Sequence, residues 1–568
     1  MLLDLRFGGS MDKSFAPLFD EIAGRSRNQF NEIITSSSSS LTQNLDWWSE
    51  NVSSRNTYSC PLFHYICCLN LFRELLKDNS PNISEIYVDS KQLQLILEKI
   101  KKNSTFCKVK ISYKKPFIQR LKNSLSPLYY EFFFLIRVLR LCLVKILSNS
   151  DNNLFNSPIV LIDTFITKNY VEEDRWYGCL WESLSEDQKS EIYFVPSFVD
   201  SSFYSFCEIL IRLRTSKRNV ILKENFLNIK DILDAYLHKF RLKRISICNS
   251  EIDGLDLTDL VAECLVSNRD VHSTMESLIT YNFLRNLSSK KIKVRLSIDW
   301  FEGHCVDKLW NLGMYKFFPY TKRFAYETFR SFPYYLSTYP IPIEKEAKVI
   351  PETFLVQGPA CVDALKEFIP ELNVISVPAL KNQHVWNSDN LQYISKNTVL
   401  VAFPISIDTS VKMLETLIQY SMTEESKEIS YILKPHPINS PSDIESKLQS
   451  HLPSSFNFSN EKSFPDLLKA CSILITEASS VCLEALAVGK PVIIINNSSG
   501  LTYDPVPRDV PRELFRKCSS HEDINSSLNY FLNLSNDDKL KIIDLSKRIR
   551  SDYFEPLTKE GLNRFLDI

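Results

Sequence analysis

A histidine enclosed by two prolines stands out in the C-terminal third of the sequence, in the segment Lys434-Pro435-His436-Pro437. The prolines restrict the backbone on both sides and prevent a helical continuation, so the imidazole is presented rigidly at the end of a predicted strand. Together with Lys434 and Pro437, such an imidazole can form a site for a phosphate or a ribose. A single histidine is more often structural, but this setting favours binding.

Two adjacent hydroxyls and two carboxylates make up a second segment about forty residues later. Ser479 and Ser480 lie where a predicted strand ends and a helix begins. Serine is a favoured helix N-cap, which accounts for one of them. A second hydroxyl at the positive end of a helix can bind phosphate without a glycine-rich loop. Glu484 can reach a ribose diol or cap a neighbouring element, and Glu477 can face the same cleft.

The N-terminal half contains one comparable segment, at residues 297–308, directly after an apolar run. It carries Asp299, Glu302 and His304. A carboxylate within hydrogen-bond reach of a hydroxyl can remove its proton while a new bond forms at the oxygen. Glu302 is our first candidate for this base, with Asp299 or His304 second. In the structural alternative, Glu302 and Asp307 pair with Lys308, Lys316 or Arg323 and hold a loop.

The C-terminal elements around the first two segments alternate between strands and helices. Strands are predicted at 398–403, 430–433, 473–476 and 492–495, and helices at 411–420, 443–450, 465–470 and 481–488. This alternation is typical of a doubly wound parallel sheet. Ligands of such sheets bind beyond the carboxyl ends of the strands, which is where both segments fall.

The N-terminal half shows the same alternation less clearly. Strands are predicted at 158–162, 192–195, 220–222, 294–298 and 353–357, and a further α/β unit at 85–112. The serine-rich run 35–40 predicts a flexible loop between two helical stretches, and Trp47-Trp48 predicts packing rather than a ligand platform. The aromatic stretch 315–319, with Thr321 and Arg323, either lines an acceptor groove or belongs to a core.

These patterns predict an α/β protein of two Rossmann-like domains that face an interdomain cleft, with extra helices in the N-terminal half. We expect an acceptor-side domain at residues 1–385 and a nucleotide-binding domain at 386–568. The loop 496–505 either closes over the ligand or is an ordinary surface turn. The last segment, 538–568, is predicted to be helical with a break near Pro556.

An insertion at about residues 114–148 departs from this alternation. Its apolar run 128–147 carries Arg137, Arg140 and Lys145 on one half of a predicted helix. The charges are unlike those of a membrane-spanning helix. The helix either lies on the anionic inner face of the cytoplasmic membrane through its basic side or is buried against its own protein.

Composition narrows the classes of function. The net charge of −1 provides no overall attraction to nucleic acid. Only 11 glycines occur in 568 residues, and no glycine-rich phosphate motif is present, which disfavours kinase, P-loop and nicotinamide mechanisms. The 14 cysteines lack C-x-x-C spacing and no secretory leader is evident, so we expect reduced thiols in the cytoplasm. We expect no metal and no cofactor.

The residues K-P-H-P, followed by S-S-V-C-L-E-A-L-A-V-G-K-P-V-I, resemble bacterial GT-B glycosyltransferases that build capsules and lipopolysaccharides. They are similar to the HP and Ser-Ser motifs of capsule Kdo transferases and bacterial sialyltransferases, which use CMP-sugars. In those families the histidine and the hydroxyl pair hold the nucleotide, which implies this role for His436, Ser479 and Ser480. The resemblance covers roughly residues 395–500. It also implies a C-terminal tail that crosses back to the first domain.

The expected function is therefore metal-independent transfer of a sugar from a nucleotide-sugar to a growing polysaccharide or lipid-linked acceptor. A CMP-sugar such as CMP-Kdo is favoured, and UDP- or GDP-sugars stay open. Lys434 and His436 are expected to neutralise the leaving phosphate. Three alternatives stay open as well: a CDP-alcohol-dependent polyol-phosphate transferase, a GT-B-type sugar-nucleotide epimerase, and a non-catalytic scaffold of a polysaccharide-assembly complex.

Overall fold

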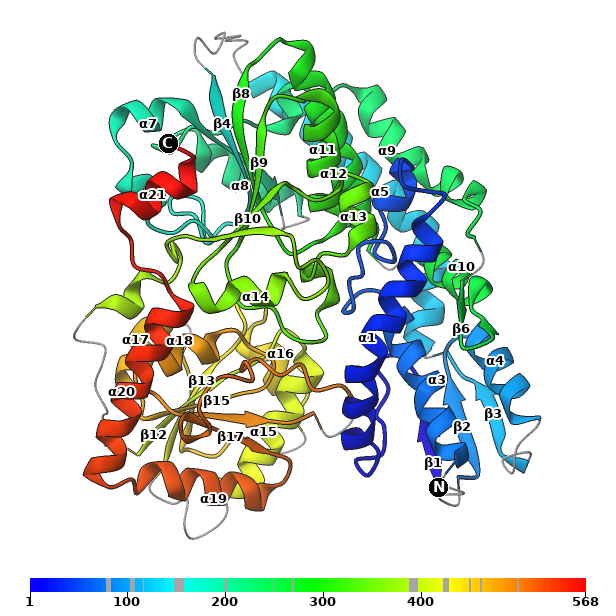
Figure 1. Ribbon diagram of the computed structural model, residues 1–568, viewed down its shortest axis with the longest axis vertical. Coiled ribbons are helices and arrows are strands. Elements are labelled where there is room, and N and C mark those ends of the chain that lie inside the picture. The colour runs from blue at the N-terminus through cyan, green and yellow to red at the C-terminus, as the bar shows by residue number, and fades with distance from the viewer. Residues whose placement is uncertain are drawn as a thin grey trace.

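The computed structural model contains two large α/β units, each built on six parallel strands, and a smaller N-terminal unit (Figure 1). It describes residues 1–77, 83–102, 108–115, 117–147, 158–198, 202–248, 250–267, 270–387, 397–421, 429–448, 451–459, 462–497 and 500–568, with the side chains of helix α5 described from residue 128 onward. The two large parallel sheets confirm the predicted α/β class with two Rossmann-like domains.

The second domain is built on one parallel sheet with the order β14-β13-β12-β15-β16-β17. Its strands are β12 (Thr398–Ala402), β13 (Ser430–Lys434), β14 (Phe456–Phe458), β15 (Ile473–Thr476), β16 (Val492–Ile495) and β17 (Phe515–Cys518). The chain winds from β12 outward to β14 and then resumes at β15 on the other side of β12. A crevice therefore forms between the carboxyl ends of β12 and β15, the usual ligand position in such sheets.

Helices cover both faces of this sheet, and serine side chains start several of them. They are α15 (Ile407–Ser421), α16 (Pro441–Glu445), α17 (Phe464–Ala470), α18 (Val481–Ala487) and α19 (His521–Leu532). Ser440, Ser463 and Ser520 each accept a hydrogen bond from the backbone N–H three residues later, at the starts of α16, α17 and α19. The predicted strands and helices of this domain are present, except that the helix predicted at 443–450 already ends at Glu445; β14 and β17 were not predicted because they are partly exposed.

The first large domain has the sheet order β11-β10-β9-β8-β4-β5, again with every neighbouring pair parallel. Its strands are β4 (Ile159–Ile166), β5 (Ile192–Phe198), β8 (Val294–Trp300), β9 (Lys322–Glu327), β10 (Thr353–Val356) and β11 (Asn373–Ser376). The winding direction changes between β4 and β8. The predicted strand at 220–222 is wrong: one parallel bridge joins Val220 to Phe194, and the chain then turns into a 3-10 helix, Lys223–Asn225.

Many helices surround this sheet, and two short strands form a hairpin among them. The elements are α6 (Leu180–Ser183), α7 (Glu186–Glu191), α8 (Phe203–Leu213), α9 (Ile229–Arg241), β6 (Glu251–Ile252), β7 (Leu255–Asp256), α10 (Thr258–Val266), α11 (Val271–Ser289), α12 (Cys305–Phe317), α13 (Pro342–Glu346) and α14 (Val362–Leu365). Helices α11 and α12 lie side by side and contribute buried residues to the same core as the N-terminal unit.

The N-terminal residues form a third unit that was predicted only in part. Strands β1 (Leu2–Asp4), β2 (Glu85–Val88) and β3 (Lys110–Tyr113) pair in parallel, and α1 (Ala16–Ser38), α2 (Leu45–Trp48), α3 (Leu62–Lys77) and α4 (Lys91–Lys101) accompany them. In Figure 1 this unit lies beside the second domain, at the lower right, while α1 extends toward the first.

The prediction of a flexible loop at residues 35–40 is wrong, because α1 continues to Ser38. The hydroxyls of these serines have partners within the protein: Ser37 Oγ lies 2.7 Å from Ser250 Oγ, and Trp47 Nε1 donates to Ser38 Oγ at 3.0 Å. Trp47 and Trp48 are fully buried, which confirms their packing role.

Helix α5 (Phe117–Leu147) forms as predicted, but its Arg137 and Arg140 side chains face the protein. Arg137 Nη2 lies 2.6 Å from Glu276 Oε2 on α11, and the guanidinium of Arg140 lies 4.7 Å from the ring centroid of Phe206. Both arginines are buried and Lys145 is exposed, so the structure agrees with the second alternative for the arginines, a helix packed against its own protein. None of the described helices has the length and apolarity that a membrane-spanning segment needs.

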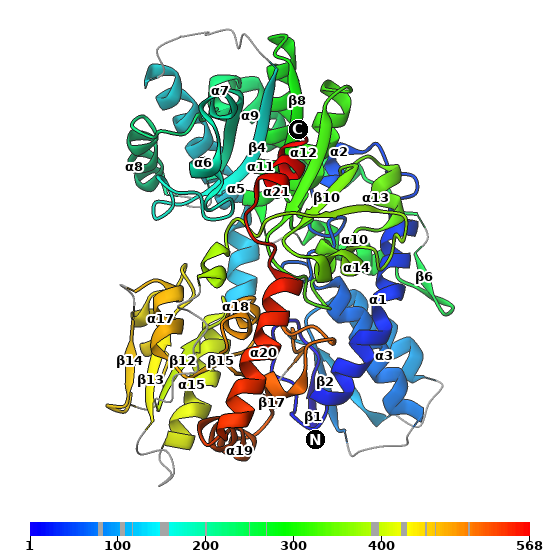
Figure 2. The ribbon, with the colours of Figure 1, turned by 60° about the vertical axis from the view of Figure 1, so that its left-hand side comes forward.

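The C-terminal tail crosses back to the first domain, as the resemblance implied. Helix α20 (Asn536–Tyr553) runs along the second domain, and α21 (Lys559–Leu566) packs on the first (Figure 2). Between them, Glu555 N donates to Gln357 O at 2.6 Å, and Glu555 O accepts from Ala379 N at 3.0 Å. The predicted boundary at 385/386 falls between β11 and β12, and α21 shares an apolar core with β4 and β8.

Candidate functional site

The segments after the central strands of the two sheets lie in one interdomain region. Glu302 follows β8, and Glu484 lies in the helix that follows β15; both strands flank the change in winding direction of their sheet. Burial lowers the pKa values of Arg175 and Lys381, and the charges of both Glu302 and Glu484 oppose this shift at each of the two cations. Both crevices therefore contribute to one electrostatic environment.

Glu302 belongs to a hydrogen-bonded group at the edge of the first sheet. The Tyr335 hydroxyl donates to Glu302 Oε2 at 2.9 Å, and His304 Nε2 lies 3.0 Å from the same oxygen. The side chains of Glu302 and His304 are 19% and 27% exposed, so solvent reaches both. Burial lowers the pKa of His304, but the hydrogen bond and charge of Glu302 outweigh burial and raise it. This geometry suits a carboxylate that accepts a proton and is held by an adjacent imidazole.

The loop around Glu302 is fixed by its backbone. Gly303 has φ +71°, and a Cβ there would lie 1.8 Å from Ser337 O, so a larger residue does not fit without a shift. Asp307 Oδ2 accepts hydrogen bonds from the backbone N–H of Glu302 at 3.0 Å and of His304 at 2.9 Å. Lys308, one of the cations of the structural alternative, pairs instead with Glu344 at 2.9 Å.

Asp299, the second carboxylate considered for the base, lies inside the domain. It is fully buried, and its Oδ2 accepts a hydrogen bond from Asn311 Nδ2 at 2.6 Å. Burial, followed by the charge of Asp307, raises its pKa well above the ordinary value. A side chain without exposure cannot contact a substrate hydroxyl, so Glu302 and His304 are the remaining candidates for the base.

Beside Glu302, two cations that were not predicted from the sequence lie over one of two stacked tryptophan rings. The ring of Trp176 stacks on Trp300 with 3.9 Å between centroids. Arg175 lies 4.6 Å and Lys381 5.4 Å from the ring of Trp176. Neither cation takes part in a salt bridge between described residues. Arg175 follows β4 and Lys381 lies in the connection between the domains, so both are available at the cleft.

His436 and Glu484 lie close to these cations, on the side of the second domain. Burial, together with the charges of Arg175 and Lys381, lowers the pKa of His436 to about 4. His436 is therefore neutral at pH 7 and can donate or accept a hydrogen bond, but it does not supply positive charge. Glu484 is buried beside His384, with 3.3 Å between Oε2 and Nε2. Its pKa stays below the ordinary value because His384 and Lys381 outweigh the effect of burial.

The structure gives less support to a phosphate-binding role for the other residues that were predicted to have one. Lys434 Nζ donates to Lys462 O at 2.9 Å, and Pro437 is exposed. Ser480 occupies the N-cap position of α18, but its hydroxyl makes no capping hydrogen bond; Ser479 precedes it and is half-buried. Arg175 and Lys381, rather than Lys434 and His436, supply the positive charge of this region.

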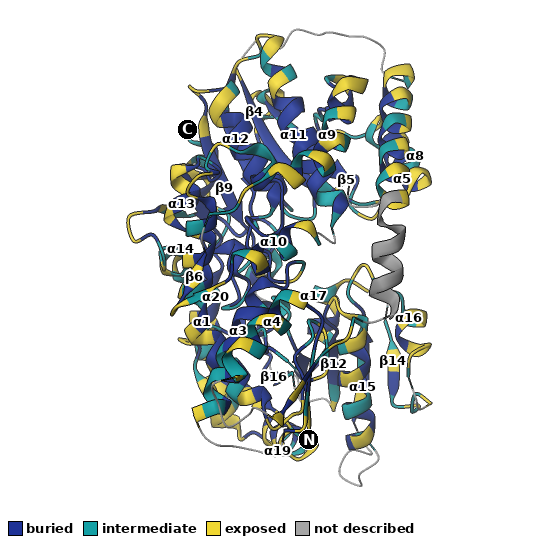
Figure 3. Ribbon diagram, turned by 90° about the vertical axis from the view of Figure 1, so that its right-hand side faces the viewer, coloured by how far each residue is buried: buried dark blue, intermediate teal, exposed yellow. Residues whose placement is uncertain are grey.

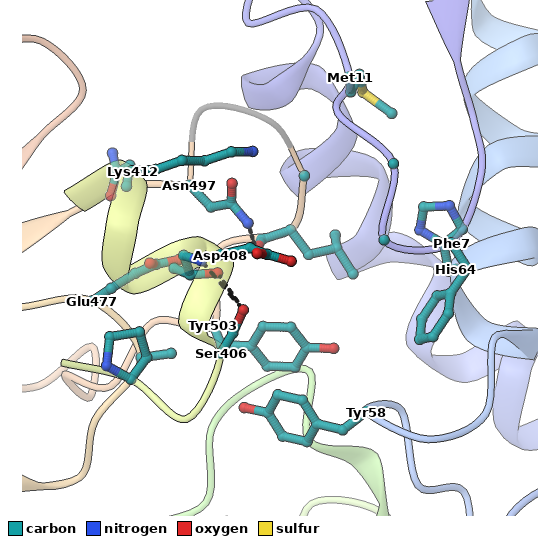
Figure 4. Close-up of a pocket in the computed structure, with 18 of the residues that line it drawn as sticks. Phe7, Met11, Tyr58, His64, Ser406, Asp408, Lys412, Glu477, Asn497 and Tyr503 are labelled. Carbon is teal, nitrogen blue, oxygen red and sulfur yellow. Dashed lines mark hydrogen bonds between the residues drawn. The ribbon is translucent and has the colours of Figure 1, made fainter. Parts of the chain in front are cut away.

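A cavity of about 440 Å³ lies between the second domain and the N-terminal unit (Figure 4). The rings of Tyr58 and Tyr503 stack there with 4.6 Å between centroids, and Tyr58 also meets the edge of Tyr335 at 5.0 Å. The cavity is thus linked to Glu302 through Tyr335. Its remaining walls carry charged and apolar side chains, among them Arg6, Phe7, His64, Asp408, Lys412 and Glu477.

The loop 496–505 was expected either to close over a ligand or to be a surface turn. In the structure it reaches the N-terminal unit: Thr502 N donates to Asp20 Oδ1 at 2.8 Å, and Tyr503 stacks on Tyr58. Residues 498–499 lie outside the described residues. The loop therefore forms part of the cavity wall between the two units.

The aromatic stretch 315–319 lies away from this region. Thr321 Oγ1 donates to Val294 O at 2.6 Å, at the amino end of β8, and Arg323 pairs with Glu352 at the start of β10. The amino ends of the strands lie at the edge opposite Glu302, so these residues do not line an acceptor groove beside Glu302.

The pH dependence of the protein's stability tests whether the Glu477 carboxyl in the cavity wall is buried. Burial raises its pKa to about 7, and the charge of Lys412 opposes this. Because an unfolded glutamate has a pKa of about 4.3, the folded state binds the proton more tightly and loses stability as pH rises from about 4.3 to 7. We expect urea denaturation to show a loss of up to about 3 kcal/mol across this window in the wild type that is absent in Glu477→Gln.

The exposed Glu445 on α16 provides the matched control, Glu445→Gln. Its pH profile should follow that of the wild type. Parallel pH profiles for Glu477→Gln and the wild type would contradict the buried, protonated carboxyl.

Among the described residues, no group of three or more His, Cys, Asp or Glu side chains is arranged to hold a metal ion. The cysteines of the described chain are free, and most of them are buried. They pack as small apolar side chains, in line with the sequence interpretation.

Comparisons with known proteins give a likeness of fold only. No protein-family model and no curated protein matches the sequence. Similar solved structures include UDP-GlcNAc 2-epimerase from Neisseria meningitidis bound to UDP-GlcNAc (13% identity, covering 72% of this chain and 98% of that one, TM-score 0.39). A UDP-forming trehalose-phosphate synthase from Burkholderia vietnamiensis (7%, 72% and 99%, 0.41) and the glycotransferase of kitacinnamycin (7%, 72% and 99%, 0.44) also match. Similarity this low says nothing about what this chain binds.

Proposed function

We propose that this protein is a glycosyltransferase that uses a nucleotide-sugar donor bound between its two large domains. The observation that carries the proposal is the meeting of Arg175 and Lys381 from the first domain with His436 and Glu484 from the second. Two cations without salt-bridge partners among the described residues provide the charge for a nucleotide phosphate. A neutral imidazole and a carboxylate beside them can hydrogen-bond the phosphate and the ribose.

In this proposal Glu302 is the base of an inverting transfer. It takes the proton of the acceptor hydroxyl while that oxygen bonds to the anomeric carbon of the donor sugar. The bond from the anomeric carbon to the nucleotide phosphate breaks, and its electron pair leaves with the phosphate. Arg175 and Lys381 stabilise the charge that develops there, and the proton stays on Glu302, next to His304.

The cavity beside Tyr58 and Tyr503 is the proposed acceptor site. Stacked aromatic rings with carboxylates and cations around them suit a sugar, whose C–H faces pack on rings while its hydroxyls find polar partners. The contact from Tyr58 to Tyr335 joins this cavity to Glu302. An oligosaccharide or lipid-linked sugar in the cavity would bring a hydroxyl toward the base.

The sequence resemblance to Kdo transferases and sialyltransferases favours a CMP-sugar. We expect calorimetric titration of the full chain with CMP, UDP, GDP and CDP to reveal one preferred nucleotide, with Kd between about 1 µM and 1 mM. Binding of CMP alone supports a Kdo- or sialic-acid-like donor, and binding of UDP or GDP supports a hexose donor. Absence of binding by all four nucleotides would contradict the proposal and favour a scaffold.

The two remaining enzyme alternatives can be distinguished by the products that they form. A polyol-phosphate transferase would consume a CDP-alcohol and form a phosphodiester. An epimerase would convert its sugar-nucleotide with no acceptor present. The cavity that is joined to Glu302 through Tyr58 and Tyr335 supports transfer to an acceptor over epimerisation, which needs room for one sugar only.

A further inference from the structure

Helix α5 carries a stripe of exposed apolar side chains on the face opposite its buried arginines. Leu128, Phe132, Leu135, Leu139 and Ile146 are each between 53% and 79% exposed. With the exposed Cys142 they follow spacings of four and three residues, so they form one continuous line along the helix. Single exposed apolar residues are ordinary, but a stripe of this length marks an interaction surface.

The two helices that pack against α5 expose apolar side chains as well. On α9 these are Ile229, Leu233, Leu237 and Phe240, and on α8 they are Phe203, Tyr204 and Ile211. Phe134 of α5 contacts Tyr236 of α9 with 4.8 Å between ring centroids. Figure 3 shows the exposed bands of α5 next to α8. Three neighbouring helices thus contribute to what we name the α5 surface, the exposed apolar side chains of α5, α8 and α9.

The orientation of α5 is fixed from inside the protein. Arg137 bonds Glu276 at 2.6 Å, and Glu276 also accepts from Lys223 Nζ at 2.8 Å. Breaking such a buried network is costly, so the helix cannot rotate to hide its leucines and expose its arginines. The apolar stripe is therefore a permanent feature of the folded chain.

Basic residues outnumber carboxylates around the α5 surface. Exposed side chains in 128–147, 202–217 and 228–244, all described, include the basic residues Lys145, Arg214, Lys217, Lys230, Lys243 and Arg244. Three carboxylates with exposed side chains lie in the same stretches, Glu131, Glu208 and Asp234, which are 50%, 38% and 45% exposed, and they pair with Lys239, Arg212 and Arg241 respectively. The surface combines exposed apolar side chains with a net positive charge.

We propose that the α5 surface binds the surface of an anionic lipid bilayer. Apolar side chains on helices that lie in the bilayer plane enter the boundary of the acyl chains, while lysines and arginines reach the headgroups. A second copy of the chain is a poorer occupant. In a twofold dimer the same surface faces itself, which would bring two sets of basic residues together with too few carboxylates to balance them.

Flotation of the full chain with vesicles tests this proposal. We expect the wild type to float with vesicles of phosphatidylglycerol and phosphatidylcholine in equal parts, and far less with phosphatidylcholine alone. High salt should weaken flotation because it screens the basic residues. The double variant Leu135→Glu/Leu139→Glu should lower the bound fraction at least about tenfold.

The matched control is Leu540→Glu on α20, which replaces a leucine that is 62% exposed in the second domain. It should float like the wild type. Because all these positions are exposed, circular dichroism should show unchanged folding. A second variant, Lys145→Glu/Lys217→Glu, removes positive charge from the α5 surface instead of apolar area. That variant should lose flotation with the anionic vesicles.

Three outcomes would overturn the proposal. The wild type could float with neither kind of vesicle, or the Leu135→Glu/Leu139→Glu variant could float as well as the wild type. In the third outcome no vesicle binds, and analytical ultracentrifugation shows a wild-type dimer that this variant dissociates. The third outcome would assign the surface to a second copy. None of them depends on the nucleotide or the transfer reaction, so the proposed function is tested separately.

Discussion

Replacement of Glu302 by glutamine should lower kcat of sugar transfer by about 10²- to 10⁴-fold, the usual contribution of a positioned general base. Glutamine keeps the shape and can still accept a hydrogen bond from Tyr335, which lies 2.9 Å from Glu302 Oε2 in the wild type. It cannot take the proton of an acceptor hydroxyl. The KM for the donor should change little, because Arg175 and Lys381 hold the nucleotide. The measurement is product formation at saturating donor and acceptor.

The matched control for this experiment is Glu352→Gln. Glu352 is also a carboxylate of the first domain, but it pairs with Arg323 at the opposite edge of the sheet. Its replacement should leave kcat near the wild-type value. A Glu302→Gln enzyme with unchanged kcat, or equal losses of kcat in both variants, would show that Glu302 is not the base.

Much of the second domain could be predicted because its strands are buried on both faces. Strands β15 and β16 are nearly continuous runs of isoleucine, valine and leucine, and both are almost fully buried. Such runs identify central parallel strands directly. Strands β14 and β17 were missed because polar, exposed residues interrupt them, so they lack this signal.

The direction in which α5 faces could not be read from the sequence. Apolar residues occur all round the run 128–147, so the position of the arginines was the only guide to orientation. Those arginines are buried because Glu276, more than a hundred residues later, pairs with Arg137. Neither periodicity nor composition reveals such a distant partner.

The candidate site was predicted for its carboxylates and its histidine but not for its cations. Glu302, His436 and Glu484 follow apolar strands closely, and this is the signal that identified them. Arg175 and Lys381 lie in irregular connections about two hundred residues apart. They meet because both pack on Trp176, which in turn stacks on Trp300 at the end of β8. A charged residue in a loop beside a tryptophan is a signal too weak to use alone.

Removal of either cation should weaken binding of the nucleotide by about ten- to a hundredfold, the usual value of a charge-assisted hydrogen bond. We expect this for Arg175→Ala and for Lys381→Ala in calorimetric titrations with the preferred nucleotide. The corresponding nucleoside, which lacks the phosphate, should bind both variants as it binds the wild type. Lys462→Ala is the control, since this lysine contributes only a backbone carbonyl to Lys434.

The same variants report on the meeting of the two domains without any knowledge of the substrate. Burial is the main reason that the pKa of His436 falls to about 4, and the charges of Arg175 and Lys381 account for the rest. The double variant Arg175→Ala/Lys381→Ala should therefore raise the pKa of His436 in an NMR titration, while Lys462→Ala should not. A pKa that does not move would mean that the cations of the first domain do not reach the histidine of the second in solution. The proposed binding of one phosphate by both domains would then fail, whatever nucleotide the protein prefers.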